Sequence, residues 1–514
     1  MARKESSIQQ FPKSYWREFK AIPSFPPLQE NNETEIGVIG GGIAGLVSAY
    51  LLAKAGKKVV LVEAGKLIDG VTGFTTAKIT AQHGLIYEEL IRTMGEEQAK
   101  QYYEANLAGL HFIQKTAADL GIDCDLTAEH AYVYAETKKG AQKIEKEAKA
   151  YERLGIDGGL AKEEINLPFA VEAALVMRDQ AQFHPVKFLT GLIKEIERLG
   201  GKIYEQTRAL KVLDQDIPVI VTENMSLLSC DQVIIASHYP INDAEGMYFA
   251  KLSVNRSYAI AASTEMSIPI GMYISADSPT RSLRSILTES REQLLLIGGE
   301  GHVTGRSKVK TSEHYQNLET FGRKYFDIQE IPYHWSAQDL TTLDKLPYIG
   351  KMTDKSDRIL VATGFNKWGM SNGAVAGMVL TDQIMGNTNV YAGLFDPTRT
   401  KLKTVDAKSF MKDNVSVAKE LVVGKIEKTS KKIDDLRIDE GGMLEVDGKK
   451  IGGYRDKNGQ VHLVNTTCTH LGCTTKWNDA ERTWDCPCHG SRFSYEGEVL
   501  EGPAIKPLKM IEDE

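Results

Sequence analysis

The stretch Glu35-Ile-Gly-Val-Ile-Gly-Gly-Gly-Ile-Ala-Gly45 decides the fold of this chain. It opens with a short β-branched run, passes through the motif Gly40-x-Gly42-x-x-Gly45 and leads into the apolar segment Leu46–Ala55. Glycines at this spacing allow a tight turn after a strand, let the backbone approach a pyrophosphate and permit close packing of the next helix, whose N-terminus offers free N–H groups. The stretch therefore predicts a strand, a glycine turn and a helix that bind a dinucleotide.

A second predicted strand, Lys57–Val62, follows this helix, and Glu63 stands at its end. In a dinucleotide-binding unit, an acidic side chain at this place accepts a hydrogen bond from a ribose hydroxyl. The run Ile36–Ala53 carries no charge and has about the minimum length of a membrane span, but its glycines divide it into a short strand and a separate helix. We therefore expect no integral membrane segment.

The composition is that of a globular protein with several folding units. The chain has 514 residues, of which 42% are hydrophobic and 25% charged, and about 150 residues per domain predicts roughly three to four units. The 62 basic and 69 acidic residues give a net charge of −7, so we expect no nucleic-acid partner, because such binding needs a cationic surface. The N-terminal sequence lacks the features of a signal peptide, and we expect a cytoplasmic protein.

Helical and strand-like segments alternate beyond the glycine motif, which is typical of an α/β domain with a parallel sheet. Two later segments are expected to be strands of a second, mixed or antiparallel sheet. The predicted helices are 96–120, 138–154 and 185–199, the strand after them is 202–206, and the two later strands are 253–264 and 293–297.

The chain is predicted to divide into an arm and two domains. Residues 1–33 are polar and interrupted by prolines, so we expect an extended arm that lies on the body. A charged stretch around 427–439 indicates a boundary near residue 425. Beyond it, short alternating runs separated by turn signals predict a small all-β domain. The expected domains are therefore 34–425 and 426–514.

Residues 34–400 resemble the D-amino-acid-oxidase-like (glycine/sarcosine oxidase-like) family of FAD-dependent oxidoreductases. The resemblance rests on the glycine stretch, on a small-residue loop like the one that crosses the FAD pyrophosphate, on a helix–strand segment, and on a late glycine loop that closes over the flavin ring in that family. These segments are Ile36–Glu63, Gly70–Lys78, His184–Ile203 with Asp231–Ala236, and Leu346–Gly350 with Ile359–Asn372. The resemblance implies an α/β FAD-binding (Rossmann-like) domain, a mixed-sheet substrate subdomain and a small-molecule substrate.

The resemblance also assigns cofactor-binding positions. Those at the adenosine-diphosphate site are Gly40, Gly42, Gly45 and Glu63, those in the phosphate loop are Thr75 and Thr76, and those in the late glycine loop are Gly364 and Gly369.

Two candidate catalytic residues follow from the same resemblance. Lys367 stands where amino-acid oxidases carry an arginine that holds the substrate carboxylate, and a lysine pairs with an anion without the bidentate fork. The alternative for Lys367 is a solvated surface lysine. His83 follows the phosphate loop closely enough to approach the flavin as a base, a substrate contact or a covalent tether. The alternative for His83 is a structural histidine with satisfied hydrogen bonds.

Two cysteine–histidine clusters lie near the C-terminus, Cys468-x-His470-x-x-Cys473 and Cys486-x-Cys488-His489. Structural zinc also binds two cysteines and two histidines, but it usually takes the two cysteines from one half of the motif and the two histidines from the other. Here each half supplies both residue types. That arrangement suits a [2Fe–2S] cluster in which two thiolates bind one iron and two imidazoles bind the other. We therefore predict an iron–sulfur centre in preference to a zinc site.

Residues 430–512 resemble the Rieske family. By this resemblance, Cys468 and Cys486 bind one iron, and His470 and His489 bind the other. The resemblance to the cytochrome-bc-type branch further implies a disulfide between the two remaining cysteines of the motifs, Cys473 and Cys488.

Three further positions carry expectations from that branch. Ser491 matches a hydroxyl that hydrogen-bonds a cluster sulfur, and Glu501–Ala504 resembles the proline loop that shields the cluster. High-potential members have a tyrosine where this chain has Phe493. The missing donor would have stabilised the more negative, reduced cluster, so we predict a lower reduction potential than theirs.

The predicted function is FAD-dependent oxidation of an amine or amino-acid-like small molecule, with electrons passing one at a time between the flavin and the Rieske cluster and an external electron donor or acceptor as a further partner. The alternative is a redox carrier or sensor without an organic substrate. Ring-hydroxylating oxygenase activity is disfavoured because it needs an iron held by two nearby histidines, and no two histidines outside the cluster motifs lie within ten residues of each other.

Overall fold

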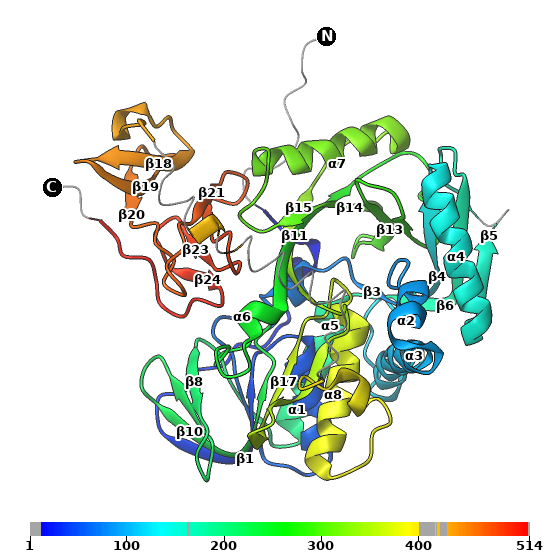
Figure 1. Cartoon of the computed structure of the whole chain (residues 1–514), viewed down its shortest axis with the longest axis horizontal. Coiled ribbons are helices and arrows are strands. Elements are labelled where there is room, and N and C mark those ends of the chain that lie inside the picture. The colour runs from blue at the N-terminus through cyan, green and yellow to red at the C-terminus, as the bar shows by residue number, and fades with distance from the viewer. Residues whose placement is uncertain (1–11, 162–164, 400–416, 418, 422–428, 512–514) are drawn as a thin grey trace.

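The computed structural model describes residues 12–161, 165–399, 417, 419–421 and 429–511. Figure 1 shows a body with two large sheets and a smaller C-terminal domain, coloured orange to red, that lies beside α7 (Thr311–Phe326) and β11 (Leu252–Ala262). The predicted domain boundary near 425 lies outside the described residues. Within the described ranges, no helix is both long and apolar enough to cross a membrane.

The first sheet of the body has eight strands and holds the glycine motif. Its central strands are parallel, as predicted, with β16 antiparallel at one edge and the hairpin β8–β9 attached to β10. The strands are β1 (Asn32–Ile39), β2 (Val59–Val62), β7 (Lys202–Tyr204), β8 (Ala209–Leu213), β9 (Val219–Thr222), β10 (Leu227–Ile235), β16 (Tyr348–Thr353) and β17 (Ser356–Thr363).

Helix α1 (Ile43–Lys54) starts at the end of the glycine turn and is buried almost throughout. It packs against α5 (Pro185–Arg198) and α8 (Gly369–Met385). A Cβ atom at Gly377 of α8 would overlap the side chain of Val47, so glycine allows the two helices to approach closely. Further helices of the body are α2 (Tyr87–Met94), α3 (Glu96–Asp119), α4 (Lys138–Leu154), α6 (Tyr248–Lys251) and α9 (Ala392–Phe395).

The second sheet has nine strands and is mixed. Most of its pairs are antiparallel, and β4 and β12 run parallel. The remaining strands are β3 (Lys78–Ile79), β4 (Thr127–Ala135), β5 (Gly158–Ala161), β6 (Ala173–Gln182), β12 (Met272–Ser275), β13 (Arg281–Leu287), β14 (Gln293–Val303) and β15 (Tyr333–Thr342).

The fold class predicted from the sequence is confirmed, but some element bounds differ. Helix α1 begins at Ile43 because the last glycine of the motif already lies in its first turn. Strand β14 extends beyond the predicted 293–297 to Val303, where glycines at 298, 299 and 301 obscure the apolar alternation. Strand β2 begins two residues later than predicted, at Val59, and β7 ends earlier, at Tyr204.

The described part of the N-terminal arm lies against the loop around residues 70–78. A short 3₁₀-helix, η1 (Tyr15–Glu18), buries Trp16. The Trp16 indole donates a hydrogen bond to the carbonyl of Thr75 at 2.7 Å, and the Ser14 hydroxyl donates one to the carbonyl of Gly73 at 2.6 Å. The arm therefore supports this loop and its short helix η2 (Val71–Phe74) from outside.

The C-terminal domain consists of two small antiparallel sheets and a 3₁₀-helix, η3 (Ile433–Asp435). The first cysteine–histidine motif lies in the loop before β21 and the second in the loop between β22 and β23. The strands are β18 (Glu440–Val446), β19 (Lys449–Arg455), β20 (Val461–Val464), β21 (Lys476–Asn478), β22 (Thr483–Asp485), β23 (Arg492–Ser494) and β24 (Val499–Glu501).

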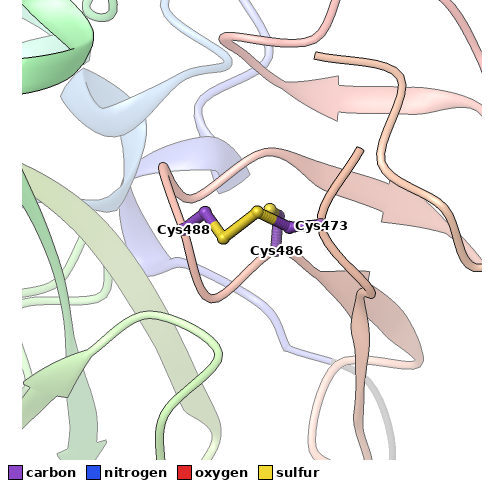
Figure 2. A group of neighbouring side chains, drawn as sticks. All are labelled: Cys473, Cys486 and Cys488. Atoms are coloured by element: carbon purple, nitrogen blue, oxygen red, sulfur yellow. A yellow bond between two sulfur atoms is a disulfide. The ribbon is translucent and has the colours of Figure 1, made fainter. Parts of the chain in front are cut away.

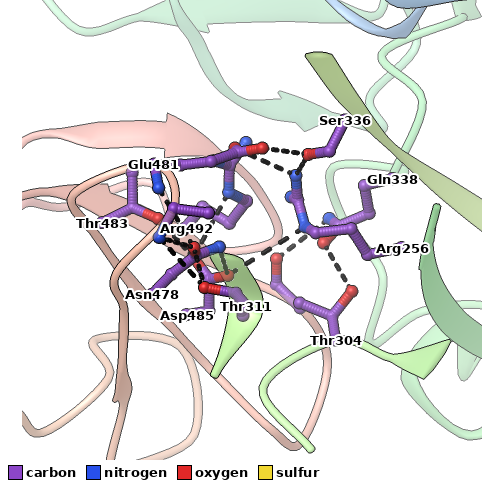
Figure 3. Close-up of polar contacts among 12 residues, drawn as sticks. Arg256, Thr304, Thr311, Ser336, Gln338, Asn478, Glu481, Thr483, Asp485 and Arg492 are labelled. Atoms are coloured by element: carbon purple, nitrogen blue, oxygen red, sulfur yellow. Dashed lines mark hydrogen bonds and ion pairs between the residues drawn. The ribbon is translucent and has the colours of Figure 1, made fainter. Parts of the chain in front are cut away.

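Buried ion pairs join this domain to the body (Figure 3). Arg256 of β11 is fully buried and lies 3.3 Å from Glu481, 3.6 Å from Glu501 and 4.0 Å from Asp485. Arg492 of the C-terminal domain pairs with the same three carboxylates. We call these two arginines and three carboxylates the seam network.

Neutral side chains extend the contact on both sides of the seam network. Ser336 bonds both Arg256 and Glu481. Thr311 donates to Asn478 at 2.7 Å, and Gln338 donates to the carbonyl of Gly490 at 2.9 Å. Because buried charges are stable only when paired, these contacts hold the C-terminal domain in one position on the body.

Replacing Arg256 by methionine should loosen the C-terminal domain. The change leaves Asp485, Glu481 and the partly exposed Glu501 with one arginine, and removing one partner of a buried pair costs roughly 3–5 kcal/mol. We expect a lower denaturant midpoint and faster proteolysis between the body and the C-terminal domain. Arg198→Met is the matched control because Arg198 forms an exposed pair with Glu195 on α5. Equal behaviour of the two variants would contradict the role of the seam network.

Candidate functional site

A cavity of about 1010 Å³ lies between the two sheets of the body. Its wall contains eight of the residues predicted from the sequence, together with a loop of the C-terminal domain, Leu500–Ile505. The eight residues are Gly40, Gly42, Glu63, Thr75, Thr76, His83, Lys367 and Gly369. Gly45 and Gly364 are not part of the wall.

The glycine turn has the properties that a bound pyrophosphate requires. Gly40 has a φ of +111°, in the region that favours glycine, and a Cβ at Gly45 would overlap the carbonyl oxygen of Gly40. Gly42 is the N-cap of α1 and has no side chain to cover the first turn of the helix. This end of α1 therefore presents backbone N–H groups and the positive end of the helix dipole to the cavity.

Glu63 lies beside the glycine turn. Its carboxylate accepts hydrogen bonds from the backbone N–H groups of Gly41 at 2.7 Å and Gly65 at 2.8 Å. Burial raises the pKa of Glu63, while these two hydrogen bonds act in the opposite direction. A carboxylate held in this way at the end of β2 is placed to accept a hydrogen bond from a ribose.

A second set of polar groups lines another part of the cavity. Lys78 is 8% exposed, and its amine donates to the carbonyl of Tyr273 at 2.8 Å and to the hydroxyl of Ser282 at 2.6 Å. Burial lowers the pKa of Lys78 to about 7, with a smaller contribution from Arg284. Burial raises the pKa of Asp339 to about 6, although nearby Lys367 opposes this shift. Lys78 and Asp339, whose charges change near neutral pH, therefore face this part of the cavity together with Lys367.

Lys367 occupies the turn between β17 and α8. Gly364 has a φ of +77°, and Asn366 and Lys367 also adopt positive φ values, of 48° and 69°. The turn directs the Lys367 amine towards β14, where it lies 3.0 Å from the position that a Cβ at Gly301 would take. Lys367 is an exposed residue, but its place on the cavity wall fits the predicted contact with an anionic group.

His83 lies on the cavity wall with both ring nitrogens engaged. Nδ1 lies 2.6 Å from the Tyr102 hydroxyl and Nε2 lies 2.8 Å from the Thr80 carbonyl, so Nε2 carries the proton. The ring stacks on Trp368 at 4.7 Å, and burial lowers its pKa to about 3. These contacts favour the structural alternative, in which a neutral His83 supports Trp368 of the late glycine loop.

The four expected cluster ligands lie close together in the C-terminal domain. The imidazole rings of His470 and His489 are 5.1 Å apart, and the Nδ1 atom of each is buried without a hydrogen-bond partner among the described residues. Cys468 and Cys486 are buried free thiols. A hydrogen bond from Cys486 is the largest of the causes that lower the pKa of Cys468 to about 6. Two unpaired imidazole nitrogens and two adjoining thiols fit a metal centre with mixed ligands.

A disulfide joins Cys473 and Cys488, the pair that the resemblance implied. Figure 2 shows it next to the Cys486 sulfur, and the three sulfur atoms lie within 4.8 Å of one another. Bonded sulfurs are not thiolates, so Cys486 is the member of this group that can bind iron. The disulfide connects the two loops that carry the expected cluster ligands.

Comparisons with known proteins identify both parts of the chain. The model of the FAD dependent oxidoreductase family matches residues 35–383, and that of the Rieske [2Fe-2S] domain matches residues 429–512. The chain belongs to the FAD dependent oxidoreductase family. It is an enzyme of that family with a C-terminal Rieske domain, and it binds FAD and a [2Fe–2S] cluster, so the zinc alternative does not hold.

Individual relatives agree with this assignment. A Bacillus subtilis (strain 168) protein named as a Rieske 2Fe-2S iron-sulfur protein, YhfW, is 44% identical over 501 residues, covering 98% of each chain. The gamma-glutamylputrescine oxidoreductase of Escherichia coli (strain K12) is 23% identical and covers 71% of this chain and 86% of its own. The structure of glycine oxidase from Geobacillus kaustophilus superposes with a TM-score of 0.60 at 17% identity, covering 72% of this chain and 99% of that one, and shows the same fold.

Several residues of the site were not predicted from the sequence. Lys78 is the last residue of the phosphate loop Gly70–Lys78. It is buried in β3, which is only two residues long and therefore shows no alternating pattern in the sequence. Asp339 lies in β15, and its proximity to Lys367 depends on the pairing of distant segments. Asp243 lies 3.0 Å from the ring nitrogen Nε2 of His470, although 227 positions separate the two residues. The members of the pairs Asp339–Lys367 and Asp243–His470 come from segments that are far apart in the sequence. A search for charged residues beside the late glycine loop would therefore not have found these pairs.

Substitutions of single cysteines should distinguish the cysteines that bind the cluster from those that do not. In Cys468→Ser we expect loss of iron and acid-labile sulfide while FAD remains bound, because one ligand of the cluster is lost. The control Cys124→Ser removes a buried thiol of the body and should leave the iron content unchanged. In the double variant Cys473→Ser/Cys488→Ser all four ligands remain, so the cluster should assemble and then decay faster on warming. Full iron content in Cys468→Ser would contradict the ligand assignment.

Proposed function

We propose that the enzyme oxidises a small amine or amino-acid-like substrate in the cavity and that electrons pass one at a time between FAD and the Rieske cluster. The observation that carries this proposal is the shared wall: Leu500–Ile505 of the Rieske domain lines the same cavity as Gly40 and Glu63. The loop of the Rieske domain that resembles the cluster shield therefore adjoins the space for the dinucleotide cofactor.

Different parts of the cavity wall bind the cofactor and the substrate. The glycine turn and the start of α1 hold the phosphates of the cofactor, and Glu63 holds its ribose. When bound, FAD supplies an acceptor for a hydride and can release the two electrons separately. Lys78, Lys367 and Asp339 set the charge of the wall that faces a small substrate. The relatives named as glycine oxidase and gamma-glutamylputrescine oxidoreductase support a nitrogen-containing substrate.

Anaerobic titration of the holoenzyme with small amines and amino acids tests the proposal. We expect one compound to bleach the flavin absorbance and a Rieske-type paramagnetic signal of the reduced cluster to follow. Cys468→Ser is the matched control, since its flavin should still bleach without that signal. Bleaching with a cluster that stays oxidised would contradict the electron exchange. Reduction of both centres by a one-electron carrier, with no response to any amine or amino acid, would instead favour the redox carrier without an organic substrate.

The charge of the cavity wall predicts how anion binding depends on pH. Lys78 is cationic below about pH 7, and Asp339 is neutral below about pH 6. Both changes favour a bound carboxylate at low pH, so acetate should bind about tenfold more tightly at pH 5.5 than at pH 8, a difference of about 1.4 kcal/mol. The flavin absorbance change on binding measures the dissociation constant.

Two variants separate these contributions to acetate binding. Lys78→Met should remove the step near pH 7 and keep the one near pH 6, whereas Asp339→Asn should do the reverse. Lys100→Met is a control on the exposed side of α3. Acetate binding that is independent of pH in the wild-type enzyme would contradict the role of these groups.

A further inference from the structure

Both ligand loops of the Rieske domain lie against the body. Arg306 donates a hydrogen bond to the carbonyl of Pro487 at 2.7 Å, and Gln338 donates one to that of Gly490 at 2.9 Å. The Phe249 ring of the body lies 6.2 Å from the ring of His489. The histidine side of the cluster site therefore faces residues of the flavin-binding body.

The segment after β10 connects this contact to the cavity. Residues 236–241 line the cavity, and Asp243 lies two residues beyond them. Nε2 of His470 lies 3.0 Å from a carboxylate oxygen of Asp243, while Nδ1 is left free for iron. The ring of Tyr239, within the same segment, lies 6.4 Å from the His470 ring. A run of a few residues thus touches the flavin cavity at one end and a cluster ligand at the other.

We propose that Asp243 is a positioning residue for electron exchange, which fixes His470 against the body and makes residues 237–243 the bridge between the flavin cavity and the cluster. This inference rests on the proposed exchange of electrons between the two cofactors. In the step it serves, one electron leaves the reduced flavin and reduces one iron of the cluster from the ferric to the ferrous state, and no bond is formed or broken in the bridge.

Two physical effects follow from the contact. A hydrogen bond from the second nitrogen of a ligand histidine to a carboxylate fixes the orientation of the ring and makes it a stronger donor to the metal. The negative charge of Asp243 also favours the oxidised cluster, which carries more positive charge than the reduced one. Asp243 therefore acts on both the geometry and the reduction potential of the cluster.

Charge and geometry can be separated with three substitutions at this position. Asp243→Asn keeps a hydrogen-bonding group and removes the charge, so the ratio of reduced to oxidised cluster at a fixed potential should rise about tenfold, which corresponds to about 59 mV. Asp243→Glu keeps the charge and should hold this ratio within about twofold of the wild-type value. Asp243→Ala removes both, and we expect electron transfer from flavin to cluster to slow at least tenfold in stopped-flow measurements.

The matched control is Glu245→Gln. Glu245 lies in the same loop as Asp243, but its carboxylate accepts a hydrogen bond from Asn242 instead of contacting a ligand histidine. Flavin reduction by the substrate should be unchanged in all variants, because the change lies on the cluster side. The paramagnetic spectrum and the histidine nitrogen couplings of the reduced cluster should change in Asp243→Asn and Asp243→Ala but not in Glu245→Gln.

The outcomes distinguish this inference from the proposed function. If wild-type flavin and cluster exchange electrons and the Asp243 variants match Glu245→Gln in potential, spectrum and rate, the inference is overturned and the proposed function stands. If the wild-type flavin is reduced by substrate and never reduces the cluster, the proposed function fails. If Asp243→Ala loses its cluster, Asp243→Asn and Asp243→Glu decide the matter, and loss of iron from Asp243→Asn as well would overturn the role in electron exchange.

Discussion

The arrangement of the two redox sites depends on the buried ion pairs of the seam network. Arg256 comes from the body and Arg492 from the Rieske domain, and the same three carboxylates surround both. Burial alone would raise the pKa values of Asp485 and Glu501, but the two arginines lower them. The net shift of each pKa is downward. These groups stay charged, so separating the domains would leave unpaired charges and is strongly unfavourable. The Rieske domain is therefore a fixed part of the enzyme.

Glu501 gives this network a second consequence. Its carboxylate pairs with Arg492, while the loop that contains it forms part of the cavity wall. The contacts that hold the Rieske domain in place thus also complete the flavin cavity. Because an electron hop requires a short separation, a domain held against the flavin cavity in this way suits the proposed electron exchange within one chain.

The parts predicted from the sequence are those whose chemistry is encoded locally. The glycine turn from Gly40 to Gly45 and the two cysteine–histidine motifs each fall within a few residues, so their residue types and spacing, together with the strand and helix predicted around the glycine turn, indicated the ligand class. Arg256, Asp243 and Asp339 were missed because their partners lie far away in the sequence and meet them only through the pairing of β11, β15 and the loop after β10. His83 was assigned two alternative roles because its neighbours come from distant segments, Tyr102 from α3 and Trp368 from the turn before α8.

The surroundings of the cluster bear on the kind of electron exchange it can support. Phe493 is fully buried in the core around the cluster site and has no hydroxyl to donate to it. The carboxylate of Asp243 touches one ligand, and the seam network contains three acidic groups and two basic ones. Arg306, next to Pro487, offsets part of this negative charge. A missing donor and an excess of nearby negative charge both favour the oxidised cluster, in line with the predicted lower reduction potential. In the proposed function, a cluster of low potential does not withdraw electrons irreversibly from a neighbouring flavin, which suits an exchange of single electrons in either direction.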